Sequence, residues 1–283
     1  MSDSAESSSI GRCLIGAPVV YVMEVSMRIA ICASDLDAIK TDLRLAHPEI
    51  KPSLRIEAAA RALGYNTYGG LRAALEKGTI EAEADDARYR EILGLSAETN
   101  KRCAVRPVGR ALARIELRKV LDHHPNLTCR GFDSIWFNVS GERSLPINER
   151  KELLATRRRE AYDDDWSADQ FELAWIYLSR QERTATINRR VGSYGLKHRA
   201  EGLSRNFDLF EHLGNYVSNG MLIAAAYAHG FMVKPVGHDD YNAYFNISMR
   251  TVKVTYGRDG EQLRENRQHI DRMYGDIADR MAA

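Results

Sequence analysis

The segment RPVGRALARIELRKVL, residues 106–121, carries the clearest helical pattern in this chain. Pro107 suits the first turn of a helix, because the N–H that proline lacks would have no partner there. One side of the predicted helix is apolar and can face a core, while an arginine recurs at every fourth position, close to one turn apart. The apolar residues are Val108, Leu112, Ile115 and Val120, and the four arginines, which we call the arginine row, are Arg106, Arg110, Arg114 and Arg118.

The arginine row predicts contact with an anion. Residues 101–119 hold seven basic residues and a single acid, Glu116. Like charges four residues apart slightly destabilise a helix, and the phosphates of a nucleic acid would compensate for that repulsion. The alternative partner is intramolecular. Residues 81–98 hold six acids against two arginines, and this acidic stretch could fold against the row.

A second basic segment covers residues 177–205, with seven basic residues against two acids. Arginines with an interleaved aromatic suit contacts to phosphates and bases, and Gly192 permits a tight turn or a close backbone approach. The predicted contact residues of this segment are Arg189, Arg190, Tyr194, Lys197 and Arg199. The alternative is a pair of surface helices whose charges form ordinary ion pairs.

Cap and stop residues divide the rest of the chain into four predicted parts. They are a peripheral arm (1–33), a three-helix unit (34–78), a middle part with an acidic connector, the basic helix and a short aromatic strand (79–145), and a C-terminal domain (146–283). In the three-helix unit the predicted helix starts are Ser34, Ser53 and Thr67. The aromatic strand is placed at residues 132–139.

The C-terminal domain combines helices with a hairpin. Helices are predicted from Ser167, Ser193 and Ser218, then a hairpin or wing with arms at 231–236 and 244–254, and a charged helix from Glu261. The predicted fold class is mainly α with a small β component: an N-terminal helical bundle plus a C-terminal α+β unit with a hairpin or wing.

Composition limits the class of protein. The 283 residues include 40 Lys and Arg against 39 Asp and Glu, for a formal charge of +1, so only local charge can identify a charged partner. No run approaches the ~18 apolar residues of a membrane helix, which predicts no membrane contact. The four cysteines are sparse, as expected of reduced thiols in a cytoplasm.

No motif predicts a catalytic centre, a metal site or a cofactor. Cys103, His123, His124 and Cys129 lack the paired spacing of structural zinc ligands. Phosphate loops, nucleophile elbows and HExxH sequences are absent. A weaker enzyme alternative centres on Tyr194, Lys197 and His198, but the sequence shows no third group that would position them.

Residues 56–75 have part of a helix-turn-helix spacing. Ala60 lies four residues before Gly64, which would let two helices cross closely. Gly69 and Gly70 stand where a recognition helix needs strong helix formers, so a packing module is favoured over a groove reader.

Two blocks resemble known bacterial families. Residues 35–75, with AAARALGY at 58–65 and LRAAL at 71–75, resemble a small helical domain appended to bacterial glyoxalase-superfamily proteins and also found alone in plasmid-associated proteins. INRRVGSYGLKH (187–198), YVSNG (216–220) and NAYFNIS (242–248) resemble an uncharacterised family of plasmid and integrative-element proteins. The resemblance implies a mobile-element setting and carries over no metal ligands.

Together these observations predict a nucleic-acid-binding accessory protein of a mobile genetic element, with DNA favoured over RNA. Its two arginine-rich faces would contact phosphates. The alternative is a protein-binding inhibitor of a host defence complex, anti-CRISPR-like or anti-restriction-like, that occupies an acidic or nucleic-acid-binding surface. The oligomeric state is not predicted.

Overall fold

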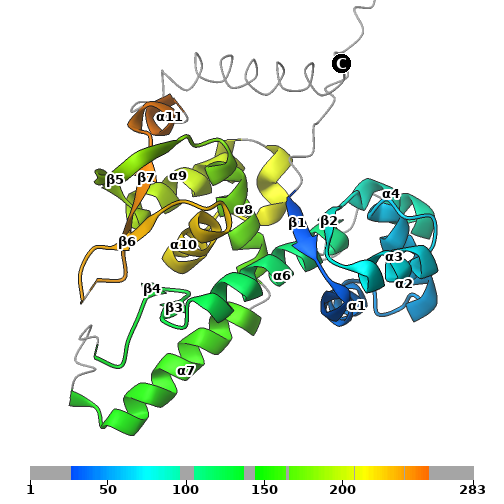
Figure 1. Cartoon of the computed structure of the whole chain (residues 1–283), viewed down its shortest axis with the longest axis horizontal. Helices are drawn as coiled ribbons and strands as arrows, with labels where there is room; N and C mark the ends of the chain where they lie inside the picture. Colours follow the sequence, from blue (N-terminus) through cyan, green and yellow to red (C-terminus); the bar gives the residue numbers. More distant parts are fainter. Residues whose placement is uncertain are drawn as a thin grey trace, which may run out of the picture.

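A computed structural model describes residues 27–95, 105–136, 144–163, 166–206, 208–238 and 240–254. It shows an N-terminal unit and a larger C-terminal unit joined by one long helix, α6 (Pro107–His123) (Figure 1). Helices dominate and the sheets are small, with two or three strands each. The predicted fold class, mainly α with a small β component, is confirmed.

The N-terminal unit contains the predicted three helices and a two-stranded ribbon. Its elements are β1 (Arg28–Ile31), α1 (Leu36–Ala46), α2 (Pro52–Ala62), α3 (Tyr68–Lys77), β2 (Ile80–Glu83) and α4 (Asp86–Leu93). Thr67 caps α3 as predicted, because its hydroxyl accepts the amide of Gly70. The other two starts differ: a 3-10 turn (Ala33–Asp35) precedes α1, and Pro52 rather than Ser53 opens α2.

Two predicted boundaries in this unit are wrong. The peripheral arm was placed at 1–33, yet β1 belongs to the core, with Ile29 and Ile31 buried. Its antiparallel partner β2 lies in the stretch predicted as an acidic connector, and α4 follows in the same stretch. Short alternating patterns of four residues are too weak to be recognised before their partner strand is known. Residues 1–26 lie outside the described part of the chain.

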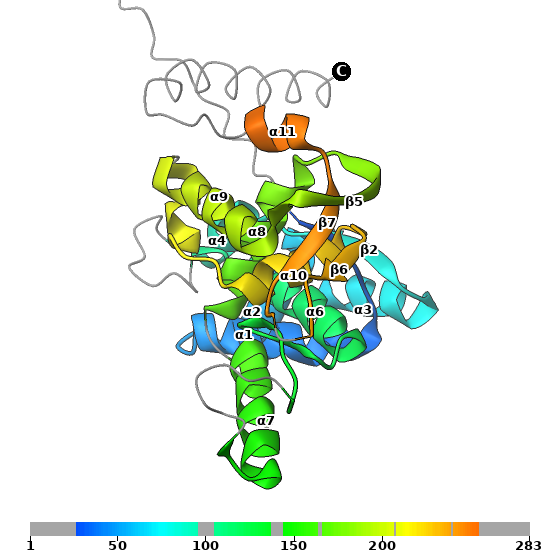
Figure 2. The same ribbon diagram turned by 90° about the vertical axis from the view of Figure 1, so that its left-hand side faces the viewer.

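Helix α6 is buried over most of its circumference, because helices of both units pack against it. It contacts α1 and α4 on the N-terminal side, and α7 (Ile147–Asp163), α8 (Ser167–Ser179) and α10 (Asn219–Ala228) on the C-terminal side. Leu112 and Leu117 are fully or almost fully buried, and the buried apolar residues of both units form one continuous core. Figure 2 shows α7 projecting from this core as an arm.

The predicted aromatic strand at 132–139 is confirmed only at Phe132, and residues 133–136 are not in a strand. A tight hairpin stands there instead, formed by β3 (Leu127–Thr128) and β4 (Gly131–Phe132), and residues 135–136 form a turn. The hairpin lies against α10, since a Cβ on Gly220 would lie 1.8 Å from the carbonyl oxygen of Thr128. Residues 137–143 are not described.

The C-terminal unit packs α8, α9 (Ser193–Asn206) and α10 beside a three-stranded antiparallel sheet of order β5-β7-β6. The strands are β5 (Arg183–Gly192), β6 (Val233–Pro235) and β7 (Ala243–Ile247); a short helix, α11 (Met249–Val254), follows. The β6–β7 hairpin confirms the predicted wing, but the second arm, predicted at 244–254, is too long, because the strand ends at Ile247 and Met249–Val254 form α11. The helix predicted after Glu261 lies outside the described residues.

Strand β5 was not predicted, and it is irregular. It pairs with β7 at Arg183, Asn188 and Gly192, with register shifts between these positions. Asn188 stabilises the irregularity, because its side-chain amide donates to the carbonyl of Ile247 and its oxygen accepts the amide of Arg190. Bulges of this kind change the direction of side chains at a sheet edge.

Candidate functional site

The arginine row is not a free basic surface. Carboxylates of the same chain contact it: Arg106 pairs with Glu172 and Asp86, Arg110 with Asp169 at 3.3 Å, and Arg114 with Asp42 at 2.9 Å. Arg110 and Arg114 are each only 6% exposed, and Arg118 is half-buried. The prediction that the row holds phosphates is therefore wrong for Arg106, Arg110 and Arg114, and for Arg118 it stays a prediction. Of the predicted acidic stretch, Asp86 folds against the row, while the other carboxylates come from α1 and α8.

Burial controls the charges around α6. Loss of water raises the pKa of Asp42, although Arg114 acts in the opposite direction. It also raises the pKa of Asp86 to about 6, against the pull of Arg106. The Asp86 carboxylate accepts the amides of Val108 and Gly109 at 2.8 and 2.9 Å, at the start of α6. These ion pairs connect α6 to the helices packed against it.

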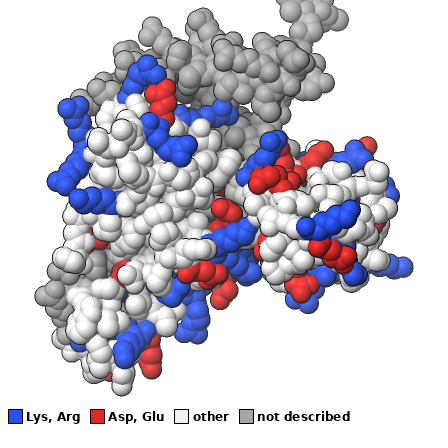
Figure 3. Space-filling model, viewed as in Figure 1, with Lys and Arg blue, Asp and Glu red and all other residues white. Residues whose placement is uncertain are grey.

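Part of the second basic segment is open to solvent: Arg189 and Arg190 are exposed, while Lys197 is only 6% exposed. We define the basic edge as the exposed cationic side chains of β5, β6 and α11, namely Arg183, Arg189, Arg190, Lys234 and Arg250. The three elements contain no acidic residue. Glu182 directly precedes β5 and pairs with Arg250 at 2.8 Å. Figure 3 shows blue side chains gathered on the side of the molecule that carries β5 and α11.

A cleft of about 780 Å³ lies beside α9. The three blocks that resemble plasmid and integrative-element proteins meet in its wall: 187–198 supplies Tyr194, Lys197 and His198, 216–220 supplies Tyr216, and 242–248 supplies Asn242. Segments far apart in sequence thus contribute to one site. The β3–β4 hairpin and the first turns of α8 complete the wall.

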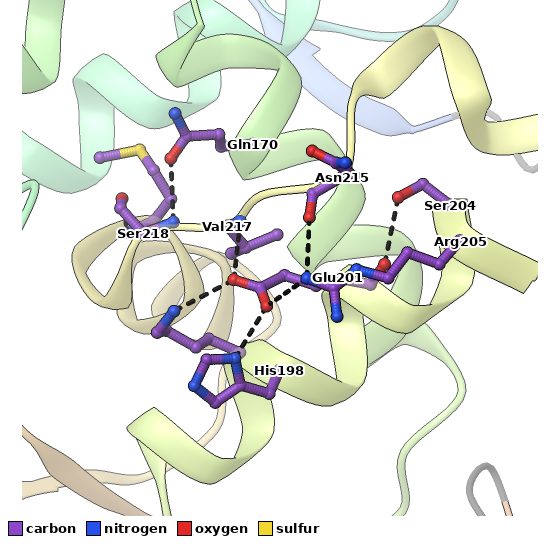
Figure 4. A network of polar contacts seen from close by, with 10 residues as sticks. Gln170, His198, Glu201, Ser204, Arg205, Asn215, Val217 and Ser218 are labelled. Atoms are coloured by element: carbon purple, nitrogen blue, oxygen red, sulfur yellow. Dashed lines mark hydrogen bonds and ion pairs between the residues drawn. The ribbon is translucent and has the colours of Figure 1, made fainter.

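A buried carboxylate organises the α9 side of this cleft (Figure 4). Glu201 is 1% exposed. It accepts hydrogen bonds from Lys197 at 3.0 Å, from Arg205 at 3.3 Å and from the amide of Val217 at 3.3 Å. Its other close neighbour is Nδ1 of His198, at 2.8 Å. One carboxylate therefore fixes two side chains of the cleft, Lys197 and His198.

The pKa of Glu201 shifts in the opposite direction to the pKa values of Asp42 and Asp86 beside α6. Burial alone would raise its pKa, but the hydrogen bonds from His198 and Lys197 and from the amide of Val217 outweigh burial, so the pKa is lowered. The carboxylate is consequently ionised at neutral pH. Acting as acceptor, it assigns the Nδ1 proton to His198 and directs the opposite ring nitrogen, Nε2, away from Glu201.

Two aromatic rings stand at the cleft on either side of an ammonium group. Tyr194 and Tyr216 are 58% and 55% exposed. The Nζ atom of Lys197 lies 5.1 Å from the centroid of the Tyr194 ring and 5.0 Å from that of Tyr216. These distances suit cation–π attraction. Large exposed aromatic surface is costly in water, and here it borders the cleft.

The predicted residues of the second basic segment separate into three groups. Arg189 and Arg190 lie on the basic edge, and Tyr194 and Lys197 lie in the cleft. Arg199 belongs to neither, because it is half-buried and donates to the carbonyl of Val252 at 3.0 Å. Its contact with nucleic acid stays a prediction.

Sequence reasoning missed the role of Glu201, which counts only as one of the two acids of the second basic segment. The spacing held a usable signal: Lys197 and Arg205 lie four residues to either side of it, and His198 lies three before it. Residues three and four apart share a helix face. The third group that the enzyme alternative lacked is thus present in the structure.

Comparisons with protein-family models, curated proteins and solved structures found no match for this chain. The mobile-element setting therefore stays a prediction from resemblance. Among the described residues, no three His, Cys, Asp or Glu side chains are grouped to hold a metal ion. Within the same residues, no helix combines the length and the apolar character that crossing a membrane requires.

Proposed function

We propose that this protein binds nucleic acid through the basic edge of its C-terminal unit. Arg106, Arg110 and Arg114 of the arginine row take no part, since their charges are paired within the fold. The observation that carries the proposal is the composition of the edge: five exposed cationic side chains lie on three elements that contain no acidic residue. Such segregation in a chain of net charge +1 is the electrostatic pattern expected of a phosphate-binding surface.

The state of the edge arginines supports this proposal. Arg189 and Arg190 are exposed, and no carboxylate of the described residues pairs with either. Arg183 donates to the carbonyls of His229 and Gly230, both at 3.3 Å, so its position is fixed while its charge is not neutralised there. Positioned guanidinium groups suit bidentate contacts to phosphate.

A salt titration of binding tests the proposal. Fluorescence anisotropy would follow a labelled DNA strand of about 20 nucleotides, its RNA counterpart and a DNA duplex, from about 50 to about 200 mM salt. We expect affinity to fall steeply with salt. Replacing Arg189 and Arg190 by alanine should lower the slope of log K against log salt by about 1.4, because two phosphate contacts of a single strand are lost.

A matched control removes the same charge elsewhere. Arg61 and Arg72 are exposed helix arginines of the N-terminal unit, paired with Glu57 and Glu76. R61A/R72A should bind as the wild type does. The proposal is overturned if no strand binds at low salt, or if this control loses as much affinity as R189A/R190A. A stable complex with a host protein in place of nucleic acid would favour the inhibitor alternative.

A further inference from the structure

We infer that the cleft beside α9 binds one unpaired nucleotide of the nucleic acid, with its phosphate on Lys197 and its base against the ring of Tyr194 or Tyr216. This inference rests on the proposed function and adds a ligand geometry to it. A base can lie against an aromatic ring only when it is unstacked from its neighbours. The cleft therefore predicts a preference for single-stranded over double-stranded nucleic acid.

The phosphate side of the site is built from the Glu201 network. Lys197 has three N–H donors, of which Glu201 takes one, and no other acceptor of the described residues bonds to its ammonium group. The charges are also uneven: the single carboxylate of Glu201 faces the permanent positive charges of Lys197 and Arg205, a net of +1 without counting His198. A phosphate oxygen on Lys197 would use the remaining N–H donors of its ammonium group and balance the charge.

The base side of the site is formed by the two tyrosines. Both rings are more than half exposed, and each lies about 5 Å from the ammonium group of Lys197. A base on either ring thus places its own phosphate within reach of Lys197. Stacking on an aromatic ring tolerates any base, so this contact needs no particular sequence.

The size and position of the cleft fit a nucleotide within a longer strand. Its volume of about 780 Å³ falls among small-molecule sites. Strand β5 ends at Gly192 and α9 begins at Ser193, so Arg190 of the basic edge is four residues from Tyr194. Four residues of extended chain span at most about 14 Å. A strand lying along the basic edge therefore reaches the cleft without leaving the surface.

Anisotropy with two probes tests this site: a labelled dT strand of about 12 nucleotides and a blunt DNA duplex of similar length. We expect Y194A/Y216A to weaken binding of the dT strand about 10- to 100-fold, since one stacked base is lost, and to leave its salt slope unchanged. The duplex should bind the variant and the wild type alike. Unlabelled dTMP in competition distinguishes a free nucleotide from a nucleotide within a strand.

W136A is the matched control, because Trp136 is 65% exposed and does not line the cleft. It should bind the dT strand as the wild type does. A second variant, K197M, tests the phosphate side and should lower the salt slope by about 0.7. If the wild type binds strands but Y194A/Y216A equals W136A, the cleft inference fails and the basic-edge proposal stands. If the wild type binds neither probe, the basic-edge proposal fails, and the cleft inference with it.

Discussion

Two regions of this molecule are rich in arginine, but the arginines of one are paired inside the fold and those of the other are exposed on its surface. The arginine row of α6 lies between two units of the fold and meets Asp42, Asp86, Asp169 and Glu172. The basic edge lies on an outer strand and meets one acid, Glu182. Position in the fold, rather than the spacing of the arginines, decides whether guanidinium groups hold the protein together or remain available to a ligand.

Removing one member of a buried pair should give the largest effect. Arg114→Ala leaves the carboxylate of Asp42 buried without its main partner, so we expect a loss of about 3–5 kcal/mol in the free energy of unfolding. Urea denaturation would measure it. The double variant D42L/R114M removes both charges and should recover most of the loss. A cost below about 1 kcal/mol for R114A would contradict a structural role for the row.

The pH dependence of stability distinguishes the arginine row from the cleft by sign. Asp86 has a raised folded-state pKa of about 6, so it favours folding at low pH, and stability declines as pH rises from about 4 to about 6. The contribution of Asp86 to the free energy of unfolding changes by up to about 3 kcal/mol over this range. Glu201 has a lowered pKa, so its contribution is present above about pH 4.5 and is lost as pH falls through the folded value.

Urea midpoints between about pH 3 and pH 7 check both signs. D86N should flatten the decline between about pH 4 and pH 6, and E201Q should flatten the acid side of the curve. A D86N protein with the wild-type slope in that window would show that Asp86 is not the titrating group.

A smaller loss is expected at the seam between the β3–β4 hairpin and α10. In Gly220→Ala the new methyl group would meet the Thr128 carbonyl, so the hairpin must move, at a cost on the order of 2 kcal/mol. Thermal unfolding would record it, and affinity for single strands should fall with it because the hairpin forms part of the cleft wall. Gly237→Ala is the control: its Cβ would contact nothing within 4 Å. Equal stability of the two variants would contradict the close packing.

The smallest effect on stability is expected at the basic edge. R189A/R190A should change the free energy of unfolding by no more than about 0.5 kcal/mol, because both side chains are exposed. The same variant should show the lower salt dependence of nucleic-acid binding predicted above. A loss of stability comparable with that of R114A would show that Arg189 and Arg190 stabilise the fold, as the arginine row does, and would contradict the difference between the two regions.

Local signals in the sequence were sufficient for most helices. Pro107 marks the start of α6, Thr67 caps α3, and Ser218 caps α10 by accepting the amide of Met221. The partners of the arginine row could not be read in this way. Asp42 and Arg114, for example, are 72 residues apart, and nothing in either segment specifies the other.

The candidate site was predicted in part. Tyr194 and Lys197 were identified from a basic segment with an interleaved aromatic, and both line the cleft. Strand β5 was missed because it is exposed along most of its length and so lacks the alternation of a half-buried strand. Tyr216 was missed as a site residue because only the tertiary fold brings it to Lys197.

The irregular pairing of β5 has a consequence for how the basic edge can evolve. Contacts at Arg183 and Asn188 pin the strand on both sides of the intervening residues 184–187. Insertions between these pins would lengthen an outward excursion without moving the ladder, and each doubling of such a loop costs only about 0.6 kcal/mol. Descendants of this chain can therefore acquire a longer or shorter reach toward their ligand while keeping the same sheet.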